Sequence, residues 1–167
     1  MTKGKTDVPA DVDPRLLVRI LEEGYGPGAW HGPDLAAALA DVPPGLAFLR
    51  PGPGRHSIAE LAVHHAFYQH EVRGRLSTVA VEPFVLAGED FFAIENESIL
   101  SWSAICKLVA SEQRELEKVV TATGAGPRAG GRSDFSIDER FEAVLGITCH
   151  AVYHAGQIQL IRRLLES

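Results

Sequence analysis

Residues 149–158 read CHAVYHAGQI, and this stretch predicts both a helix and part of a metal site. His150 and His154 are four residues apart, and residues at that spacing lie one above the other on an α-helix. Both share one helical stripe with apolar residues, so we expect them to face the core. The apolar members of this stripe are Ile147, Ala151, Ile158, Ile161 and Leu165. An unpaired imidazole is costly in a core, whereas two neutral imidazoles so placed can bind one metal ion.

Helical signals also dominate the rest of the chain. Asp13 followed by Pro14 is typical of a helix start, and Gly24 is a plausible helix end. Two capping boxes, Ser57 with Glu60 and Ser136 with Glu139, predict the starts of two further helices. The predicted long helices cover about residues 14–23, 57–76, 97–121 and 136–165, with a short helix or turn over 33–40.

These elements predict an all-α fold. Only residues 79–85 have β character, and Pro83 interrupts them. Four substantial helices with apolar stripes imply a four-helix bundle with one or two long connections. We expect residues 1–12 to form a flexible N-terminal tail, residues 124–133 a flexible loop, and residues 13–167 a single domain.

The composition of the 167 residues is that of a folded, acidic protein. Hydrophobic residues make up 46% of the chain, which suits a single core. The formal net charge is −6 without a run of Lys or Arg, so nucleic acid is a disfavoured partner. No apolar run approaches the roughly 20 residues of a membrane span. The two cysteines, Cys106 and Cys149, make no disulfide framework, and we therefore expect a cytoplasmic protein.

A third histidine is needed to complete the site, because catalytic zinc sites commonly use three protein ligands. The predicted helix over 57–76 offers both His64 and His65. A helical wheel alone favours His65, which lies nearer the centre of the apolar stripe, whereas His64 lies at its edge. On this reasoning either residue can be the third ligand. For His150 and His154, a pair of hydrogen-bonded core histidines is the alternative to metal binding.

Residues 57–64 read SIAELAVH and residues 150–163 read HAVYHAGQIQLIRR. These segments resemble the second-helix and last-helix signatures of the DinB/YfiT-like superfamily, and the resemblance extends to residues 30–32, WHG. It covers most of the chain after about residue 13. It implies a four-helix bundle, often dimeric, in which three histidines hold one divalent ion such as zinc or nickel. The family spacing makes His64, His150 and His154 the ligands, and His65 stands where relatives usually carry an aliphatic residue.

The resemblance also implies a chemistry. Characterised relatives include S-transferases and isomerases that use mycothiol, bacillithiol or glutathione, while many members have no known activity. We therefore expect a homodimeric, metal-dependent enzyme of the thiol S-transferase type, with a small-molecule substrate and a low-molecular-weight thiol as cosubstrate. The alternatives are a metal-dependent hydrolase and a non-catalytic metal-binding protein of the stress response. No catalytic residue and no thiol pocket can be identified at this point.

The remaining histidines and the cysteines have structural interpretations. Cys149 points about 100° away from His150 around the helix, and we expect it to be a buried structural thiol, like Cys106. The position of His31 beside Trp30 favours a turn residue near a pocket mouth. The last two histidines are expected at the surface: His56 and His70.

Two polar groups near the histidine pair have open roles. Gln157 can contact a substrate, orient a ligand or bind a neighbouring helix. Tyr153 can act as a general acid, but a packing role is favoured. Two arginines close to the end of the last helix, Arg162 and Arg163, can bind an anionic cofactor, although their interaction with the helix dipole is the simpler interpretation.

Overall fold

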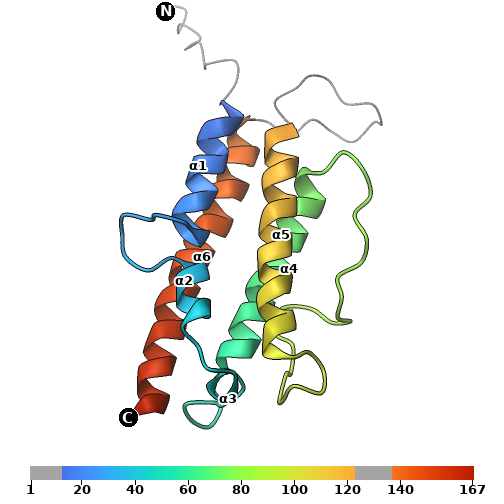
Figure 1. Cartoon of the computed structure of the whole chain (residues 1–167). Helices are drawn as coiled ribbons and strands as arrows, with labels where there is room; N and C mark the ends of the chain where they lie inside the picture. Colours follow the sequence, from blue (N-terminus) through green and yellow to red (C-terminus); the bar gives the residue numbers. More distant parts are fainter. Residues whose placement is uncertain (1–12, 123–136) are drawn as a thin grey trace, which may run out of the picture.

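The computed structural model describes residues 13–122 and 137–167, and every regular element in these ranges is a helix (Figure 1). The helices are α1 (Pro14–Tyr25), α2 (Leu35–Ala40), α3 (Pro44–Ala47), α4 (Ile58–Leu76), α5 (Trp102–Ala122) and α6 (Ile137–Glu166). The all-α prediction is confirmed for this part of the chain, and residues 79–85 form no strand. The expected tail over 1–12, the loop over 124–133 and the cap at Ser136 lie outside the described residues.

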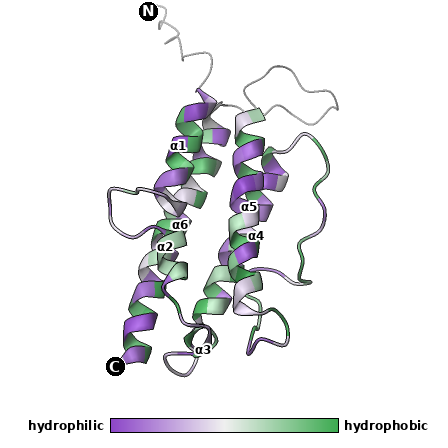
Figure 2. Cartoon of the chain, viewed as in Figure 1, coloured by the Kyte–Doolittle hydropathy of each residue, from purple (hydrophilic) through white to green (hydrophobic). Residues whose placement is uncertain are grey.

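The four longest helices pack side by side. In the views of Figures 1 and 2, α1 and α6 lie on one side and α4 and α5 on the other. Contacts join α1 to α6, α6 to α4, α4 to α5 and α5 to α1, so that each helix touches two others. Helix α2 covers part of α6. A long irregular connection, residues 77–101, runs from α4 back to α5 beside these two helices (Figure 1).

The core lies between the helices, and the four longest of them carry both hydrophobic and hydrophilic residues along their length (Figure 2). One buried cluster joins α2, α4, α5 and the C-terminal half of α6, and its largest fully buried members include Leu35, Ile58 and Ile105. A second cluster joins α1, the end of α4, α5 and the N-terminal half of α6, around Leu116. Burial of this apolar surface is the main force that holds the helices together.

The start of α4 follows the predicted capping box. The Ser57 Oγ accepts a hydrogen bond from the Glu60 backbone N–H at 3.2 Å, and Glu60 Oε2 accepts one from the Ser57 N–H at 2.9 Å. The Glu60 carboxylate is buried and also pairs with Arg50. The motif therefore fixes the start of α4, whose residues 58–66 are all buried.

The predicted end of α1 at Gly24 is wrong by two residues. The helix continues through Gly24 to Tyr25, and Gly26 caps it by donating its N–H to the Glu22 carbonyl. Gly24 instead marks a close approach of α1 to α6, since a Cβ there would lie 2.8 Å from the Thr148 carbonyl oxygen.

The predicted start of α5 near Glu97 is also wrong, because the helix begins at Trp102. The Ser101 Oγ caps it, accepting from the Ala104 N–H at 3.2 Å. Upstream, Asn96 Oδ1 accepts from the Ser98 N–H at 2.9 Å, a local bond that competes with helix formation. The buried Trp102 then secures the first turn by donating its indole N–H to the Val42 carbonyl at 3.1 Å.

Candidate metal centre

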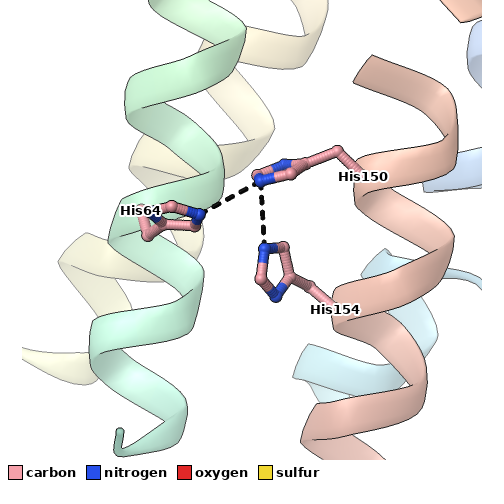
Figure 3. Close-up of side chains that lie close together, drawn as sticks. All are labelled: His64, His150 and His154. Carbon is pink, nitrogen blue, oxygen red and sulfur yellow. Dashed lines mark hydrogen bonds between the residues drawn. The ribbon is translucent and has the colours of Figure 1, made fainter. Parts of the chain in front are cut away.

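Three histidines from two adjacent helices converge on one point (Figure 3). His64 comes from α4, and His150 and His154 come from α6. The Nε2 atom of His150 lies 3.1 Å from His64 Nε2 and 3.0 Å from His154 Nε2. One ligand atom from each residue falls within 4.8 Å of the others, so the three residues could hold a metal ion. His64 and His154 are buried and His150 is half-buried.

The position of the cluster follows from the packing of α4 on α6. The spacing of four residues stacks His150 and His154 on one face of α6. Ala151 and Ala155, four residues apart, are small and buried, and a Cβ at Gly24 would lie 3.0 Å from that of Ala151, so this side of α6 faces α1. The contacts between α4 and α6 bring His64 close to the pair.

The outer nitrogen of each imidazole has a partner. His64 Nδ1 lies 3.0 Å from the Asp90 backbone carbonyl and 3.2 Å from the Asp90 carboxylate. His154 Nδ1 lies 2.6 Å from Gln157 Oε1, whose amide nitrogen in turn donates to the Tyr153 hydroxyl at 3.0 Å. Oxygen partners of this kind only accept, so the Nδ1 atoms of His64 and His154 carry the protons. Their Nε2 atoms therefore present lone pairs to the centre.

Without a metal ion, His150 cannot donate a good hydrogen bond to the Nε2 lone pairs of both His64 and His154. Its Nε2 carries at most one proton, which it would have to share between His64 and His154. Three nitrogen atoms thus meet with no more than one proton among them. A divalent cation that accepts three lone pairs resolves this crowding, and neutral imidazoles are ligands that zinc, nickel, iron and copper all accept. The residues present therefore fit a metal ion.

Burial keeps the cluster neutral. It lowers the pKa of His150 to about 3 and that of His154 to about 4, and the mutual repulsion of the protonated rings adds to the effect for His150. Burial also lowers the pKa of His64, although contact with Asp90 opposes that shift. At neutral pH all three rings can therefore offer lone pairs without first losing a proton.

The same shifts predict that the metal-free protein loses stability in mild acid. In the unfolded chain, a histidine takes up a proton near pH 6.5, whereas folded His150 and His154 do not until about pH 3 to 4. The stability is therefore complete above pH 6.5 and falls as the pH drops toward 4. Two groups would contribute roughly 2.7 kcal/mol per pH unit, and about half of that after solvent screening.

Urea denaturation of chelator-treated protein between pH 7.5 and pH 4.5 measures this slope. The double variant His150→Gln, His154→Gln serves as the control and should show a shallower decline. Equal slopes for the two proteins would contradict the expected origin of the acid sensitivity.

His65 does not point to the same centre as His64. It is fully buried, and its Nδ1 lies 3.0 Å from the Nδ1 of His150, on the opposite edge of that ring from Nε2. The group whose ligand atoms converge is therefore His64, His150 and His154, while His65 contacts His150 from another side. The helical wheel could not separate the two neighbours, because both lie on the buried side of α4.

The connection between α4 and α5 supplies residues that sequence reasoning missed. The Phe91 ring stacks between His64 and His56, with centroid separations of 3.9 and 3.8 Å. The Tyr68 hydroxyl donates to the Asp90 carboxylate at 3.3 Å. No periodic pattern marks Asp90 or Phe91, since they lie in an irregular segment more than 20 residues from His64.

A cavity of about 1070 Å³ lies beside this connection, between α4 and residues 81–90. Its wall includes Tyr68 and Asp90, both of which contact His64. Apolar rings such as Phe67 and Phe84 line it together with the charged groups of Glu71 and Arg75. Cavities of roughly 300–1000 Å³ commonly hold small molecules, so this space is large enough for one.

The burial of Cys149, Cys106 and His70 differs in part from what the sequence predicts. Cys149 is exposed, so the prediction of a buried thiol is wrong, because it lies on the same side of α6 as the exposed residues Leu145 and Tyr153. Cys106 is half-buried against the core, and burial raises its pKa. His70 was expected at the surface but is buried, 3.4 Å from Glu112 and 2.9 Å from Arg73. A polar cluster between α4 and α5 accounts for this burial.

Gln157 contacts the centre directly, and its bond to His154 supports the ligand-orienting role. His56 is exposed, as expected, and so is His31, which contacts the Glu23 carbonyl at 2.7 Å. Tyr153 is largely exposed, although its ring packs edge-on against that of His154 with 5.2 Å between centroids. Arg162 forms an ion pair with the Asp41 carboxylate at 3.3 Å, so its charge has a partner within the chain and needs no anionic cofactor.

No helix in the described ranges is both long enough and apolar enough to cross a membrane. Comparison with known proteins found no family model that matches the sequence, no similar curated protein and no similar solved structure.

Proposed function

We propose that this chain is a metal-dependent enzyme of the DinB/YfiT-like superfamily, with the four-helix-bundle fold of that group. His64, His150 and His154 would hold one divalent ion, with zinc or nickel as the first candidates. The observation that carries the proposal is the convergence of three Nε2 atoms at 3.0 and 3.1 Å while partners hold their Nδ1 atoms. Burial of the three rings in a core would not by itself require their Nε2 atoms to face one point.

The chemistry we favour is thiol S-transfer. A divalent ion held by three neutral ligands keeps its full charge and supplies Lewis acidity that activates a thiol or a water. The chain supplies the surroundings. Phe91 covers one face of the His64 ring, and the adjoining cavity offers room for a small electrophile and a low-molecular-weight thiol.

Turnover assays test the proposal. Protein loaded with zinc or with nickel is incubated with mycothiol, bacillithiol or glutathione and a chromogenic electrophile. We expect consumption of one thiol that requires the metal and that falls to background in His154→Ala. The variant His31→Ala, which removes an exposed histidine outside the cluster, should keep the activity. Failure of all three thiols with both metals would refute S-transfer, and hydrolysis of an activated ester under the same conditions would favour the hydrolase alternative.

A second candidate is a non-catalytic metal protein of the stress response. The burial of His64 and His154, which are only 5% and 3% exposed, favours it, because a closed site suits an ion that ties helices together. This candidate predicts metal binding without turnover and a large stabilisation by the ion.

We further propose a homodimer in the cytoplasm. Large apolar side chains are exposed along α6, among them Phe141, Leu145, Leu160 and Leu164. They are spaced for one face of the helix, and a second copy would cover them. Free cysteines at 106 and 149 suit a reducing compartment. Light scattering after size exclusion should give twice the mass of the chain, and a monomer mass would contradict the dimer.

A further inference from the structure

His65 occupies an unusual environment for a histidine. Only 1% of its surface is exposed, and its ring stacks on that of His150 with 5.2 Å between centroids. Its Nδ1 faces His150 Nδ1 at 3.0 Å, and its Nε2 is buried without a hydrogen-bond partner in the described residues. An aliphatic side chain would avoid that unpaired nitrogen, so His65 is a poor choice for stability alone.

The short distance between the two Nδ1 atoms requires one proton between them. If His150 carries it, the Nδ1–H of His150 donates to His65, and His150 Nε2 presents a lone pair toward His64 and His154. If His65 carries it, His150 must hold its own proton on Nε2, which points into the cluster and blocks ligation. The tautomer of His65 and the ligand capacity of His150 are therefore linked.

We propose that His65 is a positioning residue that accepts the Nδ1–H of His150 and thereby holds His150 Nε2 ready for the metal ion. This inference rests on the proposed metal site. With His65 in this role, all three ligands have an acceptor for their Nδ1–H, because Asp90 accepts from His64 and Gln157 accepts from His154. Metal-ligating histidines usually donate their other N–H to such a partner, and its loss typically lowers metal affinity 10- to 100-fold.

The tautomers of His65 and His150 change together when the ion binds. Without the ion, His65 Nδ1–H donates to His150, whose Nε2–H is shared between His64 and His154. With the ion, the His150 proton resides on Nδ1 and the His65 proton on Nε2. Each ring carries one proton in both states, so the exchange is a paired tautomer shift in which His65 neither gains nor loses charge.

Metal affinity measured by competition with a chromogenic chelator tests the role. His65→Leu is expected to bind zinc about 10- to 100-fold more weakly than the unaltered chain. Its metal-free melting temperature should be about equal, because Leu removes the unpaired nitrogen together with the hydrogen bond from His65 to His150. His65→Gln, whose Oε1 can accept from His150 as Gln157 does from His154, should recover most of the affinity. Equal affinity of His65→Leu and the unaltered chain would overturn the proposal, as would loss in both variants.

Long-range proton–nitrogen NMR spectra of the histidine rings report which nitrogen of each ring is protonated. If His65 only packed in the core, its protonated nitrogen would not change when the metal ion binds. In the zinc-loaded protein, His65 should be protonated on Nε2 and not on Nδ1, and the reverse should hold after chelation. A proton on His65 Nδ1 in both states would overturn the inference while leaving the metal site intact. If the unaltered chain binds neither zinc nor nickel, the metal site fails, and this inference fails with it.

Discussion

Substitution of His150 by Ala is expected to abolish stoichiometric metal binding. His150 is the central member of the cluster, since its Nε2 lies within 3.1 Å of the Nε2 atoms of both His64 and His154. Structural zinc sites with four ligands bind with roughly 10–16 kcal/mol, or about 3 kcal/mol per ligand, which is more than a hundredfold in affinity. Removal of one ligand from a set of three leaves an ion held by two imidazoles, too few to retain it through purification.

Elemental mass spectrometry of untagged protein measures the effect directly. The unaltered chain should carry about one divalent ion, and His150→Ala should carry almost none. His31→Ala is the matched control, because it removes a histidine that lies at the surface and outside the cluster. A full complement of metal in His150→Ala, or none in the unaltered chain after reconstitution with zinc and nickel, would show that the histidines are structural.

Removal of the metal is expected to lower the melting temperature by roughly 10 °C. An ion that binds only the folded chain, at a free concentration a thousand times its Kd, stabilises it by about 4 kcal/mol. For a domain of this size, each kcal/mol corresponds to about 2–4 °C. The physical cause is that the ion links α4 to α6, two helices whose ligands are 86 residues apart in the chain.

Calorimetry with and without chelator at pH 7.5 checks this value. His154→Ala should melt at one temperature under both conditions, since it no longer holds the ion. A shift in this variant as large as in the unaltered chain would mean that the chelator acts elsewhere. A shift well above 10 °C, together with an absence of turnover, would favour the non-catalytic alternative over the enzyme.

Local signals in the sequence were reliable wherever a helix turn is decided by its own residues. The capping box of Ser57 and Glu60 predicted the start of α4, and the structure contains both of its hydrogen bonds. The periodicity around His150 predicted the inward face of α6, where Ile147, Ala151 and Ile158 are buried. Such features depend on contacts three or four residues apart, which the sequence displays directly.

Errors arose where a contact spans distant segments. His70 was expected to be exposed, yet it is buried against Glu112, which lies 42 residues away in α5. Cys149 was expected to be buried, yet its side chain is exposed on α6. In both cases the helical position was foreseen correctly, but a helical wheel does not say which faces other helices will cover.

The sequence by itself determined that the chain is helical and that two imidazoles stack on one face of its last helix, because backbone geometry at i and i+4 is local. Only the tertiary structure decided that His64 meets this pair through Nε2 while His65 meets His150 through Nδ1. Only there do Asp90 and Gln157 accept hydrogen bonds from the Nδ1–H groups of His64 and His154. Adjacent residues on one helix point about 100° apart, so the packing of α4 against α6 selects which of the two reaches the centre.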